Sequence, residues 1–557
     1  MFVRVWLPTV LFCLQTFSGF AGAFPATNGM VASVHPVATE AGLNALKSGG
    51  NAVDAAVAVG LTLGVVDGDN SGLGGGCFML ARLANGKIVA IDGREAAPAA
   101  ATRDMFVRNG KADTSLSQTG ALASGVPGAL AAYEYAVRKF GKKKLSDLIL
   151  PAAEIAEKGF PLDASYASGL KSVADDMARF ESSRAVFFKD GQPLGKGDVL
   201  KQPDLAAAYH AIAGQGSDWF YRGPFAQATE KWMKEHGGIM TAADFASYRI
   251  KLREPITTKY RGYQIVGFPP PGSGGVHVAQ MLNILERFDL KSLDEATRLH
   301  VIAEAMKLAF ADRAHWLGDP DFAKVPRGLV SKQYAAALAK KIDKTRALEV
   351  PAHGMPPHWQ TDVFKKHTTH FSVADAEGNW VACTATVNTS FGSKVVIPGT
   401  GVVMNDEMDD FSIQPGVRNH FGLIGAEANA VTPGKRPLSS MTPTIVLQNS
   451  RPMLSLGASG GPKIITAVLM ELVGLLDLGM SPPEALAAPR IHHQWSPGEL
   501  MFERSLPPDL RAALEGRGHK LKELPSMAVS QIVARAADGK GFVGAADPRA
   551  GGNAAGW

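Results

Sequence analysis

The stretch Thr368-Thr369-His370-Phe371-Ser372 (TTHFS) lies where the character of this 557-residue chain changes. Just before it, residues 351–366 are polar, contain prolines and show no hydrophobic periodicity, which is typical of a linker or an exposed strand. A threonine at the start of a strand is usually only a β-former. It can act as a nucleophile if its own α-amine is free to serve as the base. In this chain that chemistry requires cleavage between His367 and Thr368.

Working outward from this junction, helices and antiparallel strands interleave on both sides of it. Upstream, residues 36–64 have the spacing of two helices, with Pro36 suited to a first helical turn and Asn51 to an N-cap. Downstream, residues 444–448 and 453–456 form an expected hairpin, followed by an expected helix over 464–478. This interleaving predicts one α+β layered body rather than a string of separate domains.

Composition excludes several classes of protein. Hydrophobic residues make up 46% and charged residues 20% of the chain, so a mostly disordered protein is excluded. The net charge is only +5, and no basic run is interleaved with aromatic residues, so no nucleic-acid partner is expected.

Residues 1–23 have the features of a signal peptide. Arg4 gives a basic start, residues 5–14 are apolar, and Ala21-Gly22-Ala23 is a small-residue cleavage pattern before Phe24. We therefore expect export to a periplasm or secretion. No later apolar stretch reaches about 18 residues, so no membrane span is expected after signal removal.

A first candidate for catalysis is the pentapeptide at 457–461 (GASGG), which matches the G-x-S-x-G pattern of a nucleophile elbow centred on Ser459. Its expected context of strand, turn and helix is that of a serine hydrolase. Such a site also needs an acid and a histidine downstream. The available residues are Asp477, His492, His493 and His519. So short a pattern also arises by chance in a glycine-rich chain.

Three polar features complete the set of candidates. The acidic run 405–410 (NDEMDD) is either a solvated turn or a pocket wall for a cation, and the cation is a metal or an ammonium group, although the spacing is not that of an EF-hand. Arg94 either forms a surface salt bridge, for example with Glu95, or clamps a carboxylate. Ser439 and Ser440 form a polar turn or donate hydroxyls to an anion. Together these features describe a pocket for an amino acid.

With these residues identified, the chain resembles the gamma-glutamyltransferase (gamma-glutamyl transpeptidase) family of N-terminal-nucleophile hydrolases. The resemblance runs in family order from Met30 to about Arg549. It rests on segments such as DGREAAPAAATRDMF, PPPGSGGVHVAQMLNIL, TTHFSV, NDEMDDFS, KRPLSSMTPTIV, GASGGPKI and PRIHHQW. It implies a four-layer αββα sandwich, made as a proenzyme that cleaves itself into a large fragment, 24–367, and a small catalytic fragment, 368–557. The two fragments would remain together as a heterodimer.

The resemblance also implies a role for each matching residue. Thr368 would be the nucleophile of both autoprocessing and catalysis, Thr386 would hydrogen-bond to it, and Gly460 and Gly461 would supply the amides of an oxyanion hole. The remaining residues would bind the substrate's charged end: Arg94, Ser439 and Ser440 its α-carboxylate, and Asn388, Glu407 and Asp410 its α-ammonium. No metal and no organic cofactor are expected.

The implied activity is transfer of the gamma-glutamyl group of glutathione, or of related gamma-glutamyl amides, through an ester on Thr368 to water or to an amino-acid or peptide acceptor. Other functions remain open. Within the same fold, these are a cephalosporin or glutaryl acylase and a poly-gamma-glutamate hydrolase. Outside it, they are a serine hydrolase using Ser459 and a solute-binding relative that never cleaves.

The sequence departs from the commoner family pattern in two places. Gly93 stands where an aromatic residue often precedes the clamp arginine, and Asp67-Gly68-Asp69-Asn70 stands where Glu-Pro-His is common. We expect these changes to affect the support of Arg94 or the leaving-group side of the pocket. Residues 415–426, with Phe421, form either a lid over the pocket or a plain surface loop.

Overall fold

The computed structural model describes residues 25–361 and 372–557. The predicted signal peptide, its cleavage site before Phe24, and the predicted processing site between His367 and Thr368 lie outside these residues. In the described part of the chain, no helix is both long and apolar enough to cross a membrane.

The first of two central sheets has seven strands, and every neighbouring pair is antiparallel. Its order is β10 (Lys251–Arg253), β3 (Ile88–Gly93), β2 (Gly76–Arg82), β14 (Trp380–Thr386), β13 (Ser372–Asp375), β1 (Gly29–Ser33) and β22 (Asn553–Gly556). Strands from before and after the predicted processing site therefore pair with one another within this sheet, since β14 lies beside β2, and β1 lies between β13 and β22. Cleavage of the chain would leave the hydrogen bonds between these strands in place.

The second sheet has six antiparallel strands. Its order is β11 (Ile256–Tyr260), β12 (Tyr263–Gly267), β15 (Thr444–Gln448), β16 (Arg451–Ser459), β20 (Val529–Arg535) and β21 (Phe542–Ala546). The predicted hairpin is confirmed as β15 and β16, and β16 is longer than expected at both ends.

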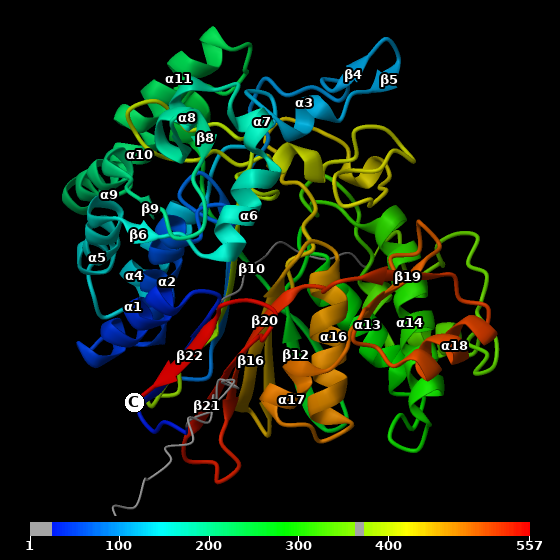
Figure 1. The fold of residues 1–557 in the computed structure, drawn as a ribbon. Coiled ribbons are helices and arrows are strands. Elements are labelled where there is room, and N and C mark those ends of the chain that lie inside the picture. Colours follow the sequence, from blue (N-terminus) through cyan, green and yellow to red (C-terminus); the bar gives the residue numbers. More distant parts are fainter. Residues whose placement is uncertain (1–24, 362–371) are drawn as a thin grey trace, which may run out of the picture.

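The two sheets face each other across an apolar layer, and helices cover their outer faces (Figure 1). In β14, Trp380 and Ala382 pack between the sheets, whereas Val381 packs toward the helices, as the two-residue period of a strand requires. Helices α1 (Pro36–Lys47), α2 (Ala52–Val66), α4 (Ala129–Phe140) and α5 (Leu145–Lys158) belong to the layer outside the first sheet. Helices α13 (Gly274–Leu285), α14 (Glu295–Trp316) and α16 (Lys463–Leu476) cover the second. The predicted αββα sandwich is confirmed.

Local signals account for much of this architecture. The predicted pair of helices over 36–64 is confirmed as α1 and α2, and the Asn51 side chain caps α2 by accepting the N–H groups of Val53 and Asp54. The helices α6 (Ala164–Ser172), α9 (Pro203–Gln215) and α11 (Pro224–Glu235) lie beside the first sheet's helical layer (Figure 1).

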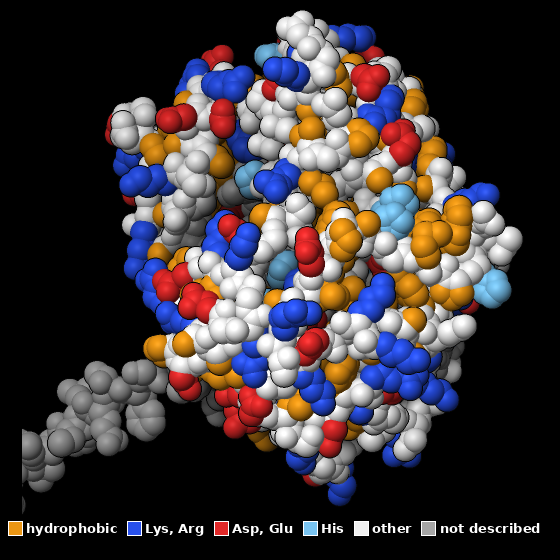
Figure 2. Space-filling view, turned by 90° about the vertical axis from the view of Figure 1, so that its right-hand side faces the viewer, with side chains coloured by type: hydrophobic (Ala, Val, Ile, Leu, Met, Phe, Trp, Pro, Cys, Tyr) orange, Lys and Arg blue, Asp and Glu red, His pale blue; other side chains and the backbone are white. Residues whose placement is uncertain are grey.

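The surface is mixed in charge. On the face shown in Figure 2, basic and acidic side chains are interspersed with apolar ones. This distribution fits the small net charge of the chain.

Candidate active site

A cavity of about 400 Å³ brings together every predicted site residue that the structure describes. These residues come from both sides of the predicted processing site, and they are Arg94, Thr386, Asn388, Glu407, Asp410, Ser439, Ser440, Gly460 and Gly461. Thr368 and His367 lie outside the described residues, so their placement stays a prediction.

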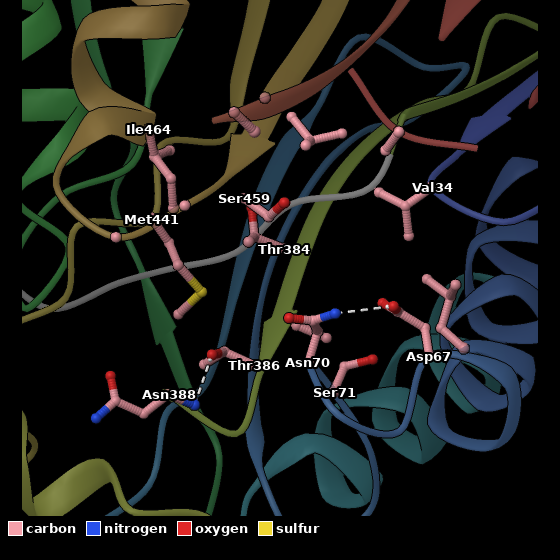
Figure 3. A pocket seen from close by; sticks show the side chains of 18 of the residues that line it. Val34, Asp67, Asn70, Ser71, Thr384, Thr386, Asn388, Met441, Ser459 and Ile464 are labelled. Carbon is pink, nitrogen blue, oxygen red and sulfur yellow. Dashed lines mark hydrogen bonds between the residues drawn. The ribbon is translucent and has the colours of Figure 1, made fainter. Parts of the chain in front are cut away.

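Thr386 stands at the end of β14, where the strand leaves the first sheet beside Gly76 of β2. The backbone at position 75 lies so close to Thr386 that only glycine fits there, because a Cβ would overlap the carbonyl oxygen of Thr386. The hydroxyl of Thr386 accepts the backbone N–H of Asn388 at 2.8 Å (Figure 3). Asn388 adopts φ +80°, a left-handed conformation that asparagine tolerates, and its side-chain amide donates to the carbonyl of Asp406 at 3.0 Å.

Arg94 follows β3 and is fully buried, so the surface salt bridge considered for it is wrong. Its Nε donates to the carbonyl of Pro437 at 3.1 Å, and one Nη donates to Asp410 Oδ2 at 2.6 Å. The other Nη donates to Glu407 and lies 3.5 Å from Glu95. The guanidinium thus joins the two halves of the predicted substrate site.

The acidic run is buried over 405–409 and Asp410 is partly buried, so its interpretation as a solvated turn is wrong. Glu407 and Asp410 contact Arg94, whereas Asp406 accepts from Thr389 and Asp409 from Ser117. Burial raises the pKa of Glu407 well above its ordinary value, Arg94 opposes that rise, and the carboxyls of Glu95 and Asp410 add to it. One carboxylate oxygen of Glu407, Oε2, is buried without a hydrogen-bond partner among the described residues. The arrangement suits an ammonium ligand, which would supply both charge and donors.

Three carboxyl groups therefore surround one guanidinium. Burial opposes the charge on Arg94, yet Glu407, Glu95 and Asp410 together hold its pKa above the ordinary value. Burial also raises the pKa of Asp410, and Arg94 counters it. Burial raises the pKa of Glu95 to about 7, so this carboxyl holds a proton below neutral pH, and a cationic substrate group nearby would favour the ionised form of the cluster.

Ser439 and Ser440 are held partly by the loop 271–273, which is distant from them in the sequence. The N–H of Ser439 donates to the carbonyl of Pro271, and the carbonyl of Ser439 accepts the N–H of Ser273, both at 2.7 Å. Arg313 of α14 donates to Ser440 Oγ at 3.1 Å and to Ser273 Oγ at 3.1 Å. Sequence reasoning missed Arg313, because it lies inside a regular helix and no local motif marks it.

Gly460 and Gly461 form the turn between β16 and α16. Their φ angles are +128° and +62°, which glycine adopts without strain. Among the described residues, neither N–H donates a hydrogen bond to another group. Both glycines line the cavity. These N–H groups can therefore stabilise a developing oxyanion.

The segment 415–426 contributes Phe421 to the cavity. A Cβ at Gly461 would lie 2.6 Å from the Phe421 ring, so the ring packs directly on the glycine turn. Asn419 Oδ1 accepts the N–H groups of Phe421 and Leu423, and Gln494 donates to the Phe421 carbonyl at 3.3 Å. The segment covers this side of the cavity, and its opening as a lid stays a prediction.

The serine-hydrolase elbow has the expected strand, turn and helix, but its partners are not assembled. Ser459 ends β16, and no hydrogen bond joins it to a downstream histidine among the described residues. His492 pairs with Thr466 and Gln494, and His519 pairs with His300. Asp477 accepts from Tyr260 at 2.6 Å.

The pH dependence of stability offers a test of the carboxyl cluster. Burial raises the pKa of Glu95 from 4.5 to about 7, despite the opposing charge of Arg94. Between these values the folded state holds a proton on Glu95 that the unfolded state releases, so Glu95 contributes a loss of stability as the pH rises from 4.5 to about 7. We expect the isosteric Glu95→Gln variant to lose less stability over this range, because only the contribution of Glu95 is removed while other buried carboxyls such as Glu407 keep theirs. Urea unfolding midpoints across this pH range measure the stability of each protein. Glu40→Gln, which changes an exposed glutamate, is the control. If the unfolding midpoint changed equally with pH in the wild type and in Glu95→Gln, the prediction would be contradicted.

An αββα sandwich with a cavity at the end of β14 and at the glycine turn after β16 defines the class, which is that of the N-terminal-nucleophile hydrolases. A family model described as gamma-glutamyltranspeptidase matches residues 38–557. The chain belongs to the gamma-glutamyltranspeptidase family.

Individual relatives agree with this assignment. The glutathione hydrolase proenzyme of Escherichia coli (strain K12) is 46% identical over 529 residues, which cover 94% of this chain and 91% of that protein. The acylase ACY 1 proenzyme of Pseudomonas sp. (strain SE83) is 40% identical, with coverage of 90% and 88%. The crystal structure of a cephalosporin acylase from Bacillus halodurans superposes with a TM-score of 0.87 at 30% identity, covering 98% of this chain and 99% of that one.

Proposed function

We propose that this protein is a gamma-glutamyl transferase and hydrolase that uses glutathione or related gamma-glutamyl amides as donors. The observation that carries the proposal is the charge arrangement at one end of the cavity. Arg94, with Ser439 and Ser440 nearby, suits a carboxylate, while Glu407 and Asp410 suit an ammonium group. An α-amino acid presents both groups on one carbon. The glutathione hydrolase names of the relatives point to the same donor.

We further propose that the chain is an exported proenzyme. The signal-like residues 1–23 would be removed, and attack of Thr368 on the carbonyl of His367 would then divide the chain into 24–367 and 368–557. The relatives named as proenzymes support processing of the chain. The interleaved strands of the first sheet support a stable heterodimer, because β13, β14 and β22 pair with strands from the other fragment.

In the proposed reaction, the hydroxyl oxygen of Thr368 attacks the donor's γ-carbonyl carbon, and the free α-amine of Thr368 takes the hydroxyl proton. Gly460 and Gly461 donate their N–H groups to the oxyanion that forms. The carbon–nitrogen bond then breaks and the amine leaves with the proton. Water, or the amine of an acceptor, attacks the resulting ester and releases Thr368. Thr386 would orient the nucleophile through its hydroxyl.

A glutaryl or cephalosporin acylase is the second candidate, since several of the similar proteins carry acylase names. A glutaryl donor lacks the α-ammonium, so it would leave Glu407 and Asp410 without the cation for which they are placed. We expect kcat/KM for γ-glutamyl p-nitroanilide to exceed that for glutaryl p-nitroanilide by at least about 10²-fold, because a site built for a polar group rejects the analogue that lacks it.

The comparison is made with both anilides on one preparation of processed protein. Glu407→Gln serves as the matched variant, since it weakens the ammonium site while preserving the shape of the side chain. We expect it to lower the ratio of kcat/KM for the γ-glutamyl anilide to kcat/KM for the glutaryl anilide. Equal rates for the two anilides in the wild type would favour the acylase.

A further inference from the structure

The cavity continues beyond Thr386 to the turn at 67–71, between α2 and β2. This turn is fastened to the chain that follows Thr386. The carbonyl of Asn70 accepts the N–H of Val387 at 3.0 Å, and the carbonyl of Asp69 accepts the N–H of Phe391 at 2.8 Å. Figure 3 shows Asp67 and Ser71 on the other side of Thr386 from Asn388. In the proposed function this is the side of the leaving group and the acceptor.

This end of the cavity is acidic. Asp67 is half-buried and lines it, as does Asp163, while Asp69 is a buried residue of the same turn that does not line the cavity and has only 5% of its surface exposed. Among the described residues that line the cavity, Arg94 is the one arginine or lysine, and it belongs to the opposite end. No fixed cation therefore balances these carboxyls within the lining.

Three buried polar atoms here have no hydrogen-bond partner among the described residues. They are Asp69 Oδ1, Ser71 Oγ and the hydroxyl of Tyr166. Ser71 and Tyr166 are each 4% exposed and line the cavity. The Tyr166 hydroxyl points at the turn, since a Cβ at Gly68 would lie 3.6 Å from it. Buried polar atoms are unfavourable when left unpaired, and a ligand that donates hydrogen bonds could pair all three, since carboxylate and hydroxyl oxygens accept.

The electrostatics agree with a cationic ligand. Burial raises the pKa of Asp67 to about 7, and Asp163 adds to the rise while a hydrogen bond from Asn70 at 2.9 Å opposes it. Burial and the Asp67 carboxyl also raise the pKa of Asp69. A bound ammonium would favour ionisation of both groups, and it has three donors for the acceptors present.

We propose that Asp67 and Asp69, with Ser71 and Tyr166, form a subsite for amines that carry a second ammonium group away from the reacting nitrogen, such as diamines and basic amino acids. The inference rests on the proposed function, and it names the preferred acceptor class of that same site. By the same charges, an amine with a distal carboxylate is a poorer acceptor than a diamine of similar length.

The reaction itself is ordinary acyl transfer. The neutral amine nitrogen attacks the γ-carbonyl carbon of the Thr368 ester, and a new carbon–nitrogen bond forms. The bond from that carbon to the threonine oxygen breaks, and the proton lost by the amine ends on that oxygen. The distal ammonium keeps its proton and stays at Asp67 throughout.

The test uses the processed protein, γ-glutamyl p-nitroanilide as donor, and two acceptors of similar length, 1,5-diaminopentane and 5-aminopentanoate. Formation of each transfer product gives kcat/KM for each acceptor. We expect the diamine to be preferred by at least about tenfold, the effect of about 1.4 kcal/mol. In Asp67→Asn and Asp69→Asn we expect the preference to fall at least about threefold. Asp67→Lys should reverse it in favour of the carboxylate.

The controls separate the possible failures. The intrinsic reactivity of each acceptor is the same for every variant, so a change in the ratio of kcat/KM for the two acceptors comes from the change in the protein. Glu157→Gln, which removes an exposed acid on α5, should keep the wild-type ratio. If the wild type turns over the donor but shares its ratio with both asparagine variants, the subsite is overturned while the proposed function stands. If the donor is never turned over, both fail. If Asp67→Asn does not fold, the acceptor preference of Asp69→Asn alone tests the proposed subsite.

Discussion

Replacing Thr368 with alanine is expected to leave one full-length band on a denaturing gel, where the wild type gives a large and a small fragment. The same change should lower the hydrolysis of γ-glutamyl p-nitroanilide by at least about 10³-fold, because no hydroxyl is left to attack either the His367 carbonyl or the donor. Gel electrophoresis of the purified protein and release of p-nitroaniline measure the two effects.

Two matched variants make this result specific. Thr369→Ala removes the neighbouring hydroxyl and should still give two bands. Ser459→Ala should give two bands and retain most of the activity, since the elbow serine has no histidine partner among the described residues. Two bands in Thr368→Ala would refute the autoprocessing mechanism, and loss of hydrolysis in Ser459→Ala alone would revive the serine hydrolase.

Replacing Arg94 with alanine is expected to lower the free energy of unfolding by about 3–5 kcal/mol, since it leaves buried carboxyls without their cation. Glu407, Asp410 and Glu95 all lie within reach of this guanidinium. Arg94→Lys keeps a charge but loses the forked geometry, so we expect KM for the γ-glutamyl donor to rise by at least about tenfold. Urea unfolding and initial rates measure these effects.

The matched control for Arg94 is Arg103→Ala. Arg103 pairs with Glu427 at 3.0 Å, but its side chain is 31% exposed, so its loss should cost about 0–1 kcal/mol. If Arg94→Ala were as mild as Arg103→Ala, the buried charge cluster would not stabilise the fold as argued. If Arg94→Lys left KM unchanged, Arg94 would not bind the donor's carboxylate.

Most of the fold was predictable, because its signals are local. The cap at Asn51 and the hairpin of β15 and β16 follow from residue types within a few positions of one another. The strand, turn and helix around Ser459 were also predictable. What that pattern could not show is that His492 and His519 are held by other partners, since those contacts join distant segments.

The candidate site divides in the same way. Family motifs pointed to the residues that line the cavity, but Arg313 lies inside the regular helix α14 and Tyr166 in α6, where no local pattern sets them apart. The acidic run at 405–410 could be solvated or buried on sequence alone, and burial was decided by the elements packed around it.

By itself, the sequence determined the strands, the helices, the family and the residue types available for chemistry, because propensity, periodicity and capping act over a few residues. Only the tertiary structure decided which charges meet. Arg94 and Glu407 are 313 positions apart, and they meet because β3 and the chain after β14 end at the same cavity. Burial there removes water from the carboxyls, so their protonation and their preference for a cation are properties of the fold.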